Sequence, residues 1–208
     1  RDGKTGSVTI GGTVSPAGGN FDEPVTQATL KVVGAFHGLS RERSDARKYP
    51  AINPLDSWSK YKSVIREDWV DFARTLFKRG QEVNQMMKVI GEEGTTTEDY
   101  IEYLKSDFLD SVYFQQNSFD EIDSSPEVER QTYVFERLLK VLGSNFELPG
   151  KDEARAFFNR LRQQFIDWNY TVWQSAEFTK KEKDIAQLYE SAKGTLTAEA
   201  QALLKDGE

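Results

Sequence analysis

The sequence predicts a mainly α-helical protein, with a short α/β piece (about residues 1–56) followed by an all-helical domain (residues 57–208). Two observations support this fold class. The first piece contains β-branched residues interrupted by glycine and proline, as in "GSVTIGGTVSPAGG", a pattern typical of strands and turns. From Tyr61 onward, apolar residues recur every three or four positions, which is typical of helices with one buried face.

In the first piece we expect a strand over residues 7–15, a loop at "SPAGGNFDEP", a short helix over residues 26–33 and a second, buried strand at "AFHGLS". Pro50 and Pro54 then hold the backbone extended or turned. Two strands and one short helix are marginal as a domain, and strand edges need partners. We therefore expect this piece to be the end of a larger sheet domain, and the chain to be a C-terminal fragment.

The first long helix is expected from the spacing of its apolar positions, which are Tyr61, Ile65, Trp69, Phe72, Leu76, Val83, Met87 and Ile90. The stretch "GEEGTTTED" interrupts this pattern. Either Thr95 with Glu98 or Thr96 with Asp99 would form a capping box for the next helix. The apolar positions of that helix are Ile101, Leu104, Phe108 and Val112.

Further helices follow in the same domain, which is expected to contain five or so helices. Ser125 and Pro126 are typical of a helix N-cap and first turn, and we expect that helix to end near Gly143. Thr179 with Glu182 predicts a second capping box, and Thr197 predicts the start of a last short helix. Between Gly143 and Thr179, another helix is expected from the apolar positions Ala154, Phe157, Leu161, Phe165, Trp168 and Val172.

The composition excludes several classes of function. The chain has no cysteine and only one histidine, His37, so thiolate and histidine-rich metal sites are excluded and we expect no metal site. A net charge of −7 argues against nucleic-acid binding. The sequence has no apolar run of about 20 residues, the length needed to cross a bilayer, and no signal-peptide pattern. Any link to a membrane is therefore expected to go through partner proteins.

The triplet Gly3-Lys4-Thr5 matches the end of a phosphate-binding P-loop. A P-loop also needs an earlier glycine and a helix that follows directly, whose amides hold the phosphates. Only two residues precede Gly3, and a strand is expected to follow. We therefore interpret the triplet as a polar turn.

Three stretches occur in the order "GSVTIGGTVSPAGGNFDEPVTQATLKVV", "KYPAINPLDSWSKY" and "FQQNSFDEID". Together they closely resemble the C-terminal third of the catalytic A subunit of V-type and archaeal-type rotary ATPases. The resemblance covers essentially the whole chain, and "SPAGG…EPV" resembles the A subunit more than the non-catalytic B subunit. It implies that residues 1–56 end a RecA-like nucleotide-binding domain whose P-loop and catalytic glutamate lie upstream of "GSVTI". No catalytic residue is therefore expected in this chain.

The resemblance implies that Tyr49, followed by Pro50, and Phe119 form the adenine side of the nucleotide pocket. A planar base gains from stacking on a rigid ring, and proline fixes the backbone beside Tyr49. Without the resemblance, Tyr49 would be interpreted as a partly buried turn residue and Phe119 as core. One departure from the family is His37, where an aromatic pair is usual near "AFHGL"; we expect it on the buried strand, as a change in packing only.

The stretch "GEEGTTTED" is expected at the tip between two long helices. Its acidic residues, Glu92, Glu93, Glu98 and Asp99, would ordinarily form a solvated turn with a capping role. The resemblance implies a further role, since in rotary ATPases this helix–turn–helix is the lever that pushes on the central shaft. An acidic tip suits a shaft with basic residues.

For the complete subunit the resemblance implies ATP hydrolysis or synthesis, coupled to shaft rotation and to H⁺ or Na⁺ transport. It also implies ATP/ADP with Mg²⁺, an alternating hexameric ring with B subunits, and a cytoplasmic location peripheral to the membrane. The chain alone is expected to be inactive. An alternative is a non-enzymatic helical adaptor whose β segment adds to a partner's sheet edge. An independent hydrolase is disfavoured, because one histidine and no cysteine leave no nucleophile–base pair.

Overall fold

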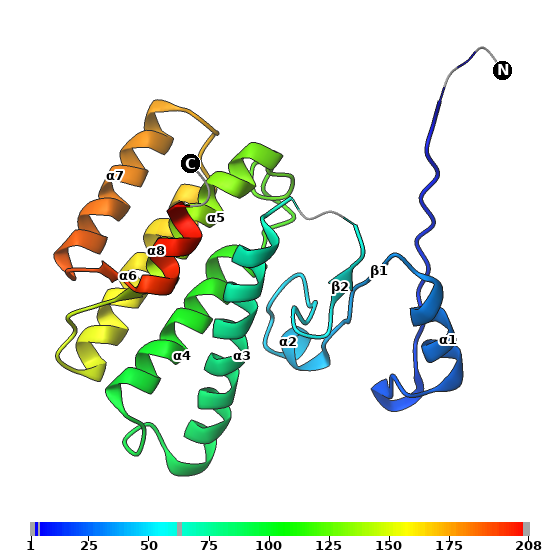
Figure 1. Ribbon diagram of the computed structural model, residues 1–208, viewed down its shortest axis with the longest axis horizontal. Coiled ribbons are helices and arrows are strands. Elements are labelled where there is room, and N and C mark those ends of the chain that lie inside the picture. Colours follow the sequence, from blue (N-terminus) through cyan, green and yellow to red (C-terminus); the bar gives the residue numbers. More distant parts are fainter. Residues whose placement is uncertain (1–2, 4, 62–63, 206–208) are drawn as a thin grey trace.

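The computed structural model describes residues 3, 5–61 and 64–205, and it is mostly helical (Figure 1), which confirms the expected fold class. Before the bundle come a 3-10 turn, two short helices and two short strands: η1 (Ala17–Gly19), α1 (Pro24–Val32), β1 (Ala35–Phe36), α2 (Arg41–Asp45) and β2 (Trp58–Ser59). The bundle then consists of α3 (Glu67–Ile90), α4 (Thr97–Leu109), the π-helical turn η2 (Asp110–Phe114), α5 (Val128–Leu142), β3 (Ser144–Asn145), α6 (Lys151–Asn169), α7 (Ala176–Ser191), β4 (Thr195–Leu196) and α8 (Ala198–Lys205).

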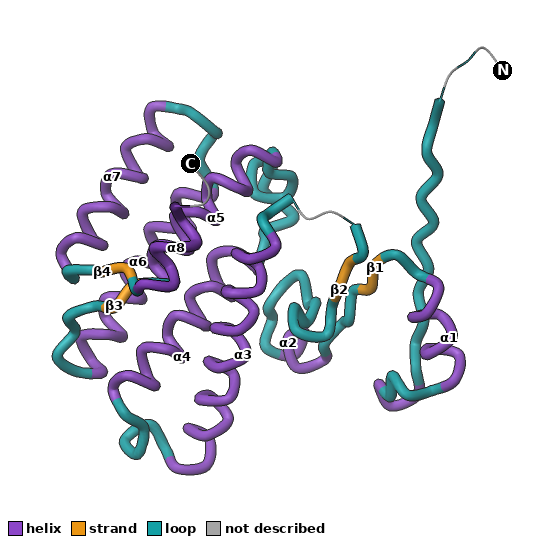
Figure 2. Tube along the Cα trace, viewed as in Figure 1, coloured by secondary structure: helices purple, strands orange, loops and turns teal. Residues whose placement is uncertain are grey.

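The segment of residues 5–15 is not a strand, so the expectation of a strand over residues 7–15 is wrong for this structure. It runs away from the rest of the molecule as a loop (Figure 2). Val8 and Ile10 are 91% and 90% exposed. A strand is stabilised by hydrogen bonds to a neighbouring strand, and no strand of the described part of the chain pairs with this segment.

The second expected strand is present but shorter than expected. β1 contains two residues and pairs antiparallel with β2, with Phe36 opposite Trp58. His37 lies outside the strand and is exposed, so its expected place on a buried strand is wrong. Phe36 takes the packing role instead, with its ring 5.6 Å from that of Phe21 and 6.3 Å from that of Trp58. The ladder is short because the backbone N–H of Gly38 donates to the Ser57 side chain rather than to a strand.

Two of the expected helix starts are confirmed. Thr96 caps α4: its hydroxyl accepts from the Asp99 backbone N–H at 3.1 Å and donates to the Asp99 carboxylate at 2.9 Å. This arrangement decides between the two capping boxes that the sequence left open. Thr197 likewise accepts from the backbone N–H of Ala200 at 3.3 Å at the start of α8.

Two other expected caps are wrong. α5 begins at Val128 with Glu127 as its N-cap, so Ser125 lies before the cap position. α7 is capped by Ser175, whose hydroxyl accepts from Phe178 N–H at 3.0 Å. Thr179 is therefore inside the helix, where its hydroxyl donates to the Ser175 carbonyl. A serine four residues earlier supplied an equally good cap and moved the helix start.

The core lies between α3, α4, α5, α6 and α7, and its most enclosed side chains include Phe108, Leu161, Phe165 and Trp168. α3 and α4 pack closely because Gly80 has no side chain, and a Cβ there would lie 2.1 Å from the Cβ of Ser106. Two helices of the bundle, α3 and α6, are shorter than the apolar spacing predicted. Tyr61 precedes α3 and Val172 follows α6, and both are exposed.

Candidate functional site

Tyr49 and Phe119 come from segments that meet at the junction of the first piece with the bundle. Tyr49 follows α2 in a turn, with a cis peptide bond to the exposed Pro50. Phe119 lies in the loop between η2 and α5. The backbone N–H of Gln116, three residues before Phe119, donates to the Tyr49 carbonyl at 3.0 Å. This bond brings the two segments together. That the two rings contact one nucleotide base stays a prediction.

Both rings are exposed, Tyr49 by 54% and Phe119 by 96%. Tyr49 borders an open cavity of about 220 Å³, which is also lined by Ser111, Gln115, Gln116, Asn117, Asp123, Ile166, Asn169 and Tyr170. Phe119 lies in the adjoining loop between η2 and α5 and does not line this cavity. An exposed phenylalanine on a loop is a feature that a binding partner or ligand would cover.

The loop around Phe119 is held by its own polar side chains. Asn117 accepts from the Phe119 backbone N–H at 3.1 Å, and its own N–H donates to Asp123 at 2.6 Å. Asp120 accepts from the backbone N–H groups of Ile122 and Asp123, each at 2.9 Å. Burial raises the pKa of Asp123, while the hydrogen bond from Asn117 and the charge of Arg130 oppose this shift. The loop thus has a defined shape although Phe119 is uncovered.

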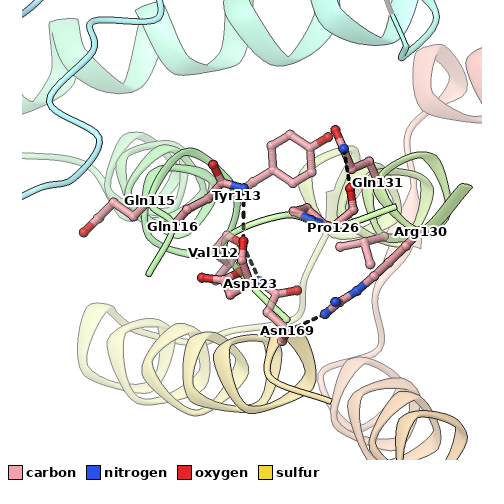
Figure 3. A pocket seen from close by; sticks show the side chains of 10 residues that line it. Val112, Tyr113, Gln115, Gln116, Asp123, Pro126, Arg130, Gln131 and Asn169 are labelled. Carbon is pink, nitrogen blue, oxygen red and sulfur yellow. Dashed lines mark hydrogen bonds between the residues drawn. The ribbon is translucent and has the colours of Figure 1, made fainter. Parts of the chain in front are cut away.

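A second cavity of about 180 Å³ lies beside the first and shares Gln115, Gln116, Asp123 and Asn169 with it. Figure 3 shows Arg130 and Asp123 facing this space from different sides. Arg130 is buried and donates to the backbone carbonyl of Asn169, and burial lowers the pKa of its guanidinium. Burial also raises the pKa of Tyr113 in the same wall. The junction therefore combines exposed aromatic rings with buried polar groups, which suits a flat, polar ligand.

Sequence reasoning missed most of this lining. Gln115 and Gln116 lie within the "FQQNSFDEID" stretch, so their place in the same motif as Phe119 was the available signal. Asn169 comes from the end of α6 and carried no signal in the sequence. Its side chain donates to the Val112 carbonyl at 2.7 Å, which joins α6 to η2.

The segment before Tyr49 is held to the bundle by ion pairs. The buried carboxylate of Asp110 binds Arg43 and Lys48, each at 2.7 Å. Lys48 also lies 3.7 Å from Asp107, and Asp107 binds Arg162 of α6 at 2.9 Å. The two pairs of Asp110 join residues more than sixty positions apart in the chain, and no feature of the sequence indicated them.

The acidic tip between α3 and α4 contacts the start of α6. Lys151 donates to the Glu92 carbonyl at 2.5 Å, and Arg155 forms an ion pair with the Glu92 carboxylate. Asp99 belongs to the Thr96 cap. Glu93 and Glu98 are exposed. The side chains of Glu92 and Asp99 thus have partners within the chain, and Lys151 also donates to the Glu93 carbonyl at 3.5 Å. Contact with a shaft stays a prediction for all four residues.

Lys4 of the P-loop-like triplet lies outside the described residues, and Gly3 and Thr5 precede the extended segment rather than a helix. Across residues 3, 5–61 and 64–205, no group of three acidic or histidine side chains is placed to hold a metal ion. In the same part of the chain, none of the helices combines the length and apolar character that crossing a membrane requires.

Both pieces of the chain match families of known proteins. Residues 1–59 match the ATP synthase alpha/beta family, nucleotide-binding domain, and residues 59–147 match the C-terminal domain of V and A type ATP synthase. The V-type ATP synthase alpha chain of Treponema denticola is 60% identical over 98% of this chain and 35% of its own length. The V-type ATP synthase alpha chain 1 of Treponema pallidum is 57% identical over 100% of this chain and 35% of its own length.

The chain therefore spans about a third of the length of the curated relatives it matches. A solved structure described as a unique ATP synthase subunit NeqB from Nanoarcheaum equitans covers 59% of this chain and 32% of that chain. The TM-score of this match is 0.49 and its sequence identity is 17%.

Proposed function

Because the chain belongs to the ATP synthase alpha/beta family, among the V-type alpha chains, we propose that it is the adenine-contacting and mechanical part of a rotary ATPase's catalytic subunit. The complete subunit would hydrolyse or synthesise ATP and couple this reaction to rotation of a shaft and to H⁺ or Na⁺ transport. This chain would contribute the base side of the nucleotide pocket and the helical domain that moves the shaft.

The observation that carries the proposal is the junction of Tyr49 with the loop of Phe119. The hydrogen bond from Gln116 to the Tyr49 carbonyl joins the two segments that the sequence singled out, and both rings are open to solvent. A planar base could rest against one or both rings, as aromatic stacking requires. The cavity beside Tyr49 supplies amide groups, from Gln115, Gln116 and Asn169, that could donate to or accept from a base edge.

The reaction itself would use groups outside this chain. Phosphoryl transfer to water needs a P-loop lysine, Mg²⁺ and a residue that positions the attacking water, and an arginine from a neighbouring subunit stabilises the charge that develops. The residues of this chain would act on the base and leave the phosphates to the rest of the subunit. The chain alone is therefore expected to release no phosphate from ATP.

The division at residues 56 and 57 would separate these two tasks. Residues 1–56 would end the RecA-like nucleotide-binding domain, and residues 57–208 would form the lever. In the complex the chain would alternate with B subunits in a hexameric ring and contact the central shaft through Glu92, Glu93, Glu98 and Asp99. It would lie in the cytoplasm and be linked to the membrane only through the ion-translocating sector of the complex. The adaptor alternative is less well supported, because among the described residues the segment expected to add to a partner's sheet edge, residues 7–15, forms no strand.

Photolabelling of the complete ATPase complex with 2-azido-ATP tests the proposed base contact. We expect label in the peptides that contain Tyr49 or Phe119, with protection by excess ATP, because the azido group sits on the base. Inorganic tripolyphosphate, which has no base, serves as the control for displacement through the phosphate site. Label confined to peptides that contain neither residue would contradict the proposed contact.

A further inference from the structure

One buried carboxylate joins the Tyr49 segment to the bundle. Asp110 is the first residue of η2, and its side chain is 2% exposed. Arg43 donates to one of its carboxylate oxygens and Lys48 to the other, each at 2.7 Å. Charge-assisted hydrogen bonds of this length are among the strong ones in proteins. Both cations precede Tyr49, and Lys48 is its direct neighbour.

The backbone of the same residue holds the other segment of the junction. The Asp110 carbonyl accepts from the backbone N–H of Gln115 at 3.1 Å, and the next N–H, that of Gln116, donates to the Tyr49 carbonyl at 3.0 Å. Lys48 and Tyr49 are covalent neighbours, as are Gln115 and Gln116. These links therefore close a ring that starts and ends at Asp110. The ring fixes the backbone of Tyr49 relative to the start of the loop that carries Phe119.

The surroundings make this side chain more than an ordinary packing contact. Arg43 is buried and forms an ion pair with Asp110, so Asp110 is the counterion of a guanidinium that is largely removed from water. Asp110 also lies where α4 changes from α-helical to π-helical geometry, a change that occurs often at functional sites. Lys48 has a second contact at 3.7 Å with Asp107, on the same face of the bundle. The charges converge on the residue next to Tyr49.

We infer that Asp110 is a positioning residue for the nucleotide base, which acts through Lys48 on the ring of Tyr49. The inference rests on the proposed adenine contact of Tyr49. Loosening the link should move the ring that the base stacks on and leave the phosphate-binding groups unchanged. The expected signature is weaker binding of ATP with unaltered binding of a ligand that has phosphates and no base.

The test uses the complete ATPase complex with Asp110→Asn and Lys48→Gln in the alpha chain. Asp110→Asn leaves the buried Arg43 without its counterion, so circular dichroism and complex assembly are measured first. Lys48→Gln is the second variant, because it keeps the pair of Asp110 with Arg43 intact. Arg41→Gln is the matched control: it removes the same charge from a pair with Asp45 that is open to solvent.

We expect both test variants to raise the KM for ATP by about three- to tenfold, the effect of losing an aromatic contact. The inhibition constant of inorganic tripolyphosphate should stay within about twofold, and kcat should change less than KM. Arg41→Gln should behave as the unmodified complex. Added to Tyr49→Ala, Lys48→Gln should have no further effect, since the two act on one contact.

Two results would overturn the inference in distinguishable ways. If Tyr49→Ala leaves the KM for ATP unchanged, the proposed adenine contact of Tyr49 is wrong, and the positioning role of Asp110 is wrong with it. If Tyr49→Ala raises the KM and Lys48→Gln does not, the contact stands and the positioning role of Asp110 is wrong. Equal changes for ATP and tripolyphosphate would likewise assign the ion pairs a purely structural role.

Discussion

The piece before residue 61 and the helical bundle are stabilised in different ways. The bundle has a closed core in which Phe165 and Trp168 are fully buried. The first piece has two-residue strands and an exposed segment with Val8 and Ile10, and much of its order comes from contacts with the bundle. Examples are Arg74, which donates to the carbonyls of Leu55 and Ser57, and the ion pairs of Asp110. The proposed base contact lies where the first piece meets the bundle.

The largest expected effect on the free energy of unfolding comes from comparing a buried apolar residue of the bundle with an exposed one of the first piece. Leu161→Ala should lower the free energy of unfolding by about 2–5 kcal/mol, because it leaves a cavity in a packed core. Val8→Ala, which removes an exposed side chain, should change it by about 0.5 kcal/mol or less. Urea denaturation of the purified chain, followed by circular dichroism, measures both. Equal effects of the two substitutions would contradict the contrast between the pieces.

A smaller effect separates a true helix cap from an apparent one within the bundle. Thr96→Ala should cost about 1 kcal/mol, because it removes the side-chain partner of the Asp99 backbone N–H. Thr179→Ala should cost clearly less, since Thr179 is inside α7 and Ser175 caps that helix. The same denaturation experiment compares them. A larger loss at Thr179 than at Thr96 would show that the assigned helix starts are wrong.

The smallest effect on stability is expected at the acidic tip of the bundle. Replacing Glu93 and Glu98 by glutamine should leave the unfolding free energy within about 1 kcal/mol, because exposed charges contribute little. Glu92→Gln should cost somewhat more, since it removes the ion pair with Arg155. In the complete complex, we expect the Glu93 and Glu98 substitutions to reduce coupling of ATP hydrolysis to ion transport. Full coupling would remove these two residues from the proposed shaft contact.

The sequence predicted the bundle better than the first piece for a physical reason. Apolar spacing reports which face of a helix is buried. α3, α4 and α6 bury most of the positions that it indicated, while Ile90 at the end of α3 is half exposed. A strand depends on a partner that its own residues do not specify, so residues 7–15 were expected as a strand that the structure does not contain. Caps were ambiguous at α4 and α7, where more than one serine or threonine stood near the helix start, and α5 has Glu127 as its N-cap instead of a serine.

The candidate site shows the same limit. Tyr49 and Phe119 could be selected because they lie in stretches that resemble a known family. The lining residue Asn169 and the pairs of Asp110 with Arg43 and Lys48 could not, since they depend on which distant segments the fold brings together. Charged residues in a polar chain are numerous, and spacing along the sequence does not distinguish a buried pair from a solvated one.

The kinetics of Tyr49→Ala and Phe119→Ala in the complete ATPase complex test the proposed base contact most directly. Each should raise the KM for ATP about three- to tenfold and leave kcat within about twofold, because a stacking contact with the base is made equally in the ground and transition states. Tyr61→Ala, at another exposed aromatic residue, should leave both constants unchanged. An unchanged KM in both test variants, or a fall in kcat alone, would contradict the assignment of these rings to the nucleotide base.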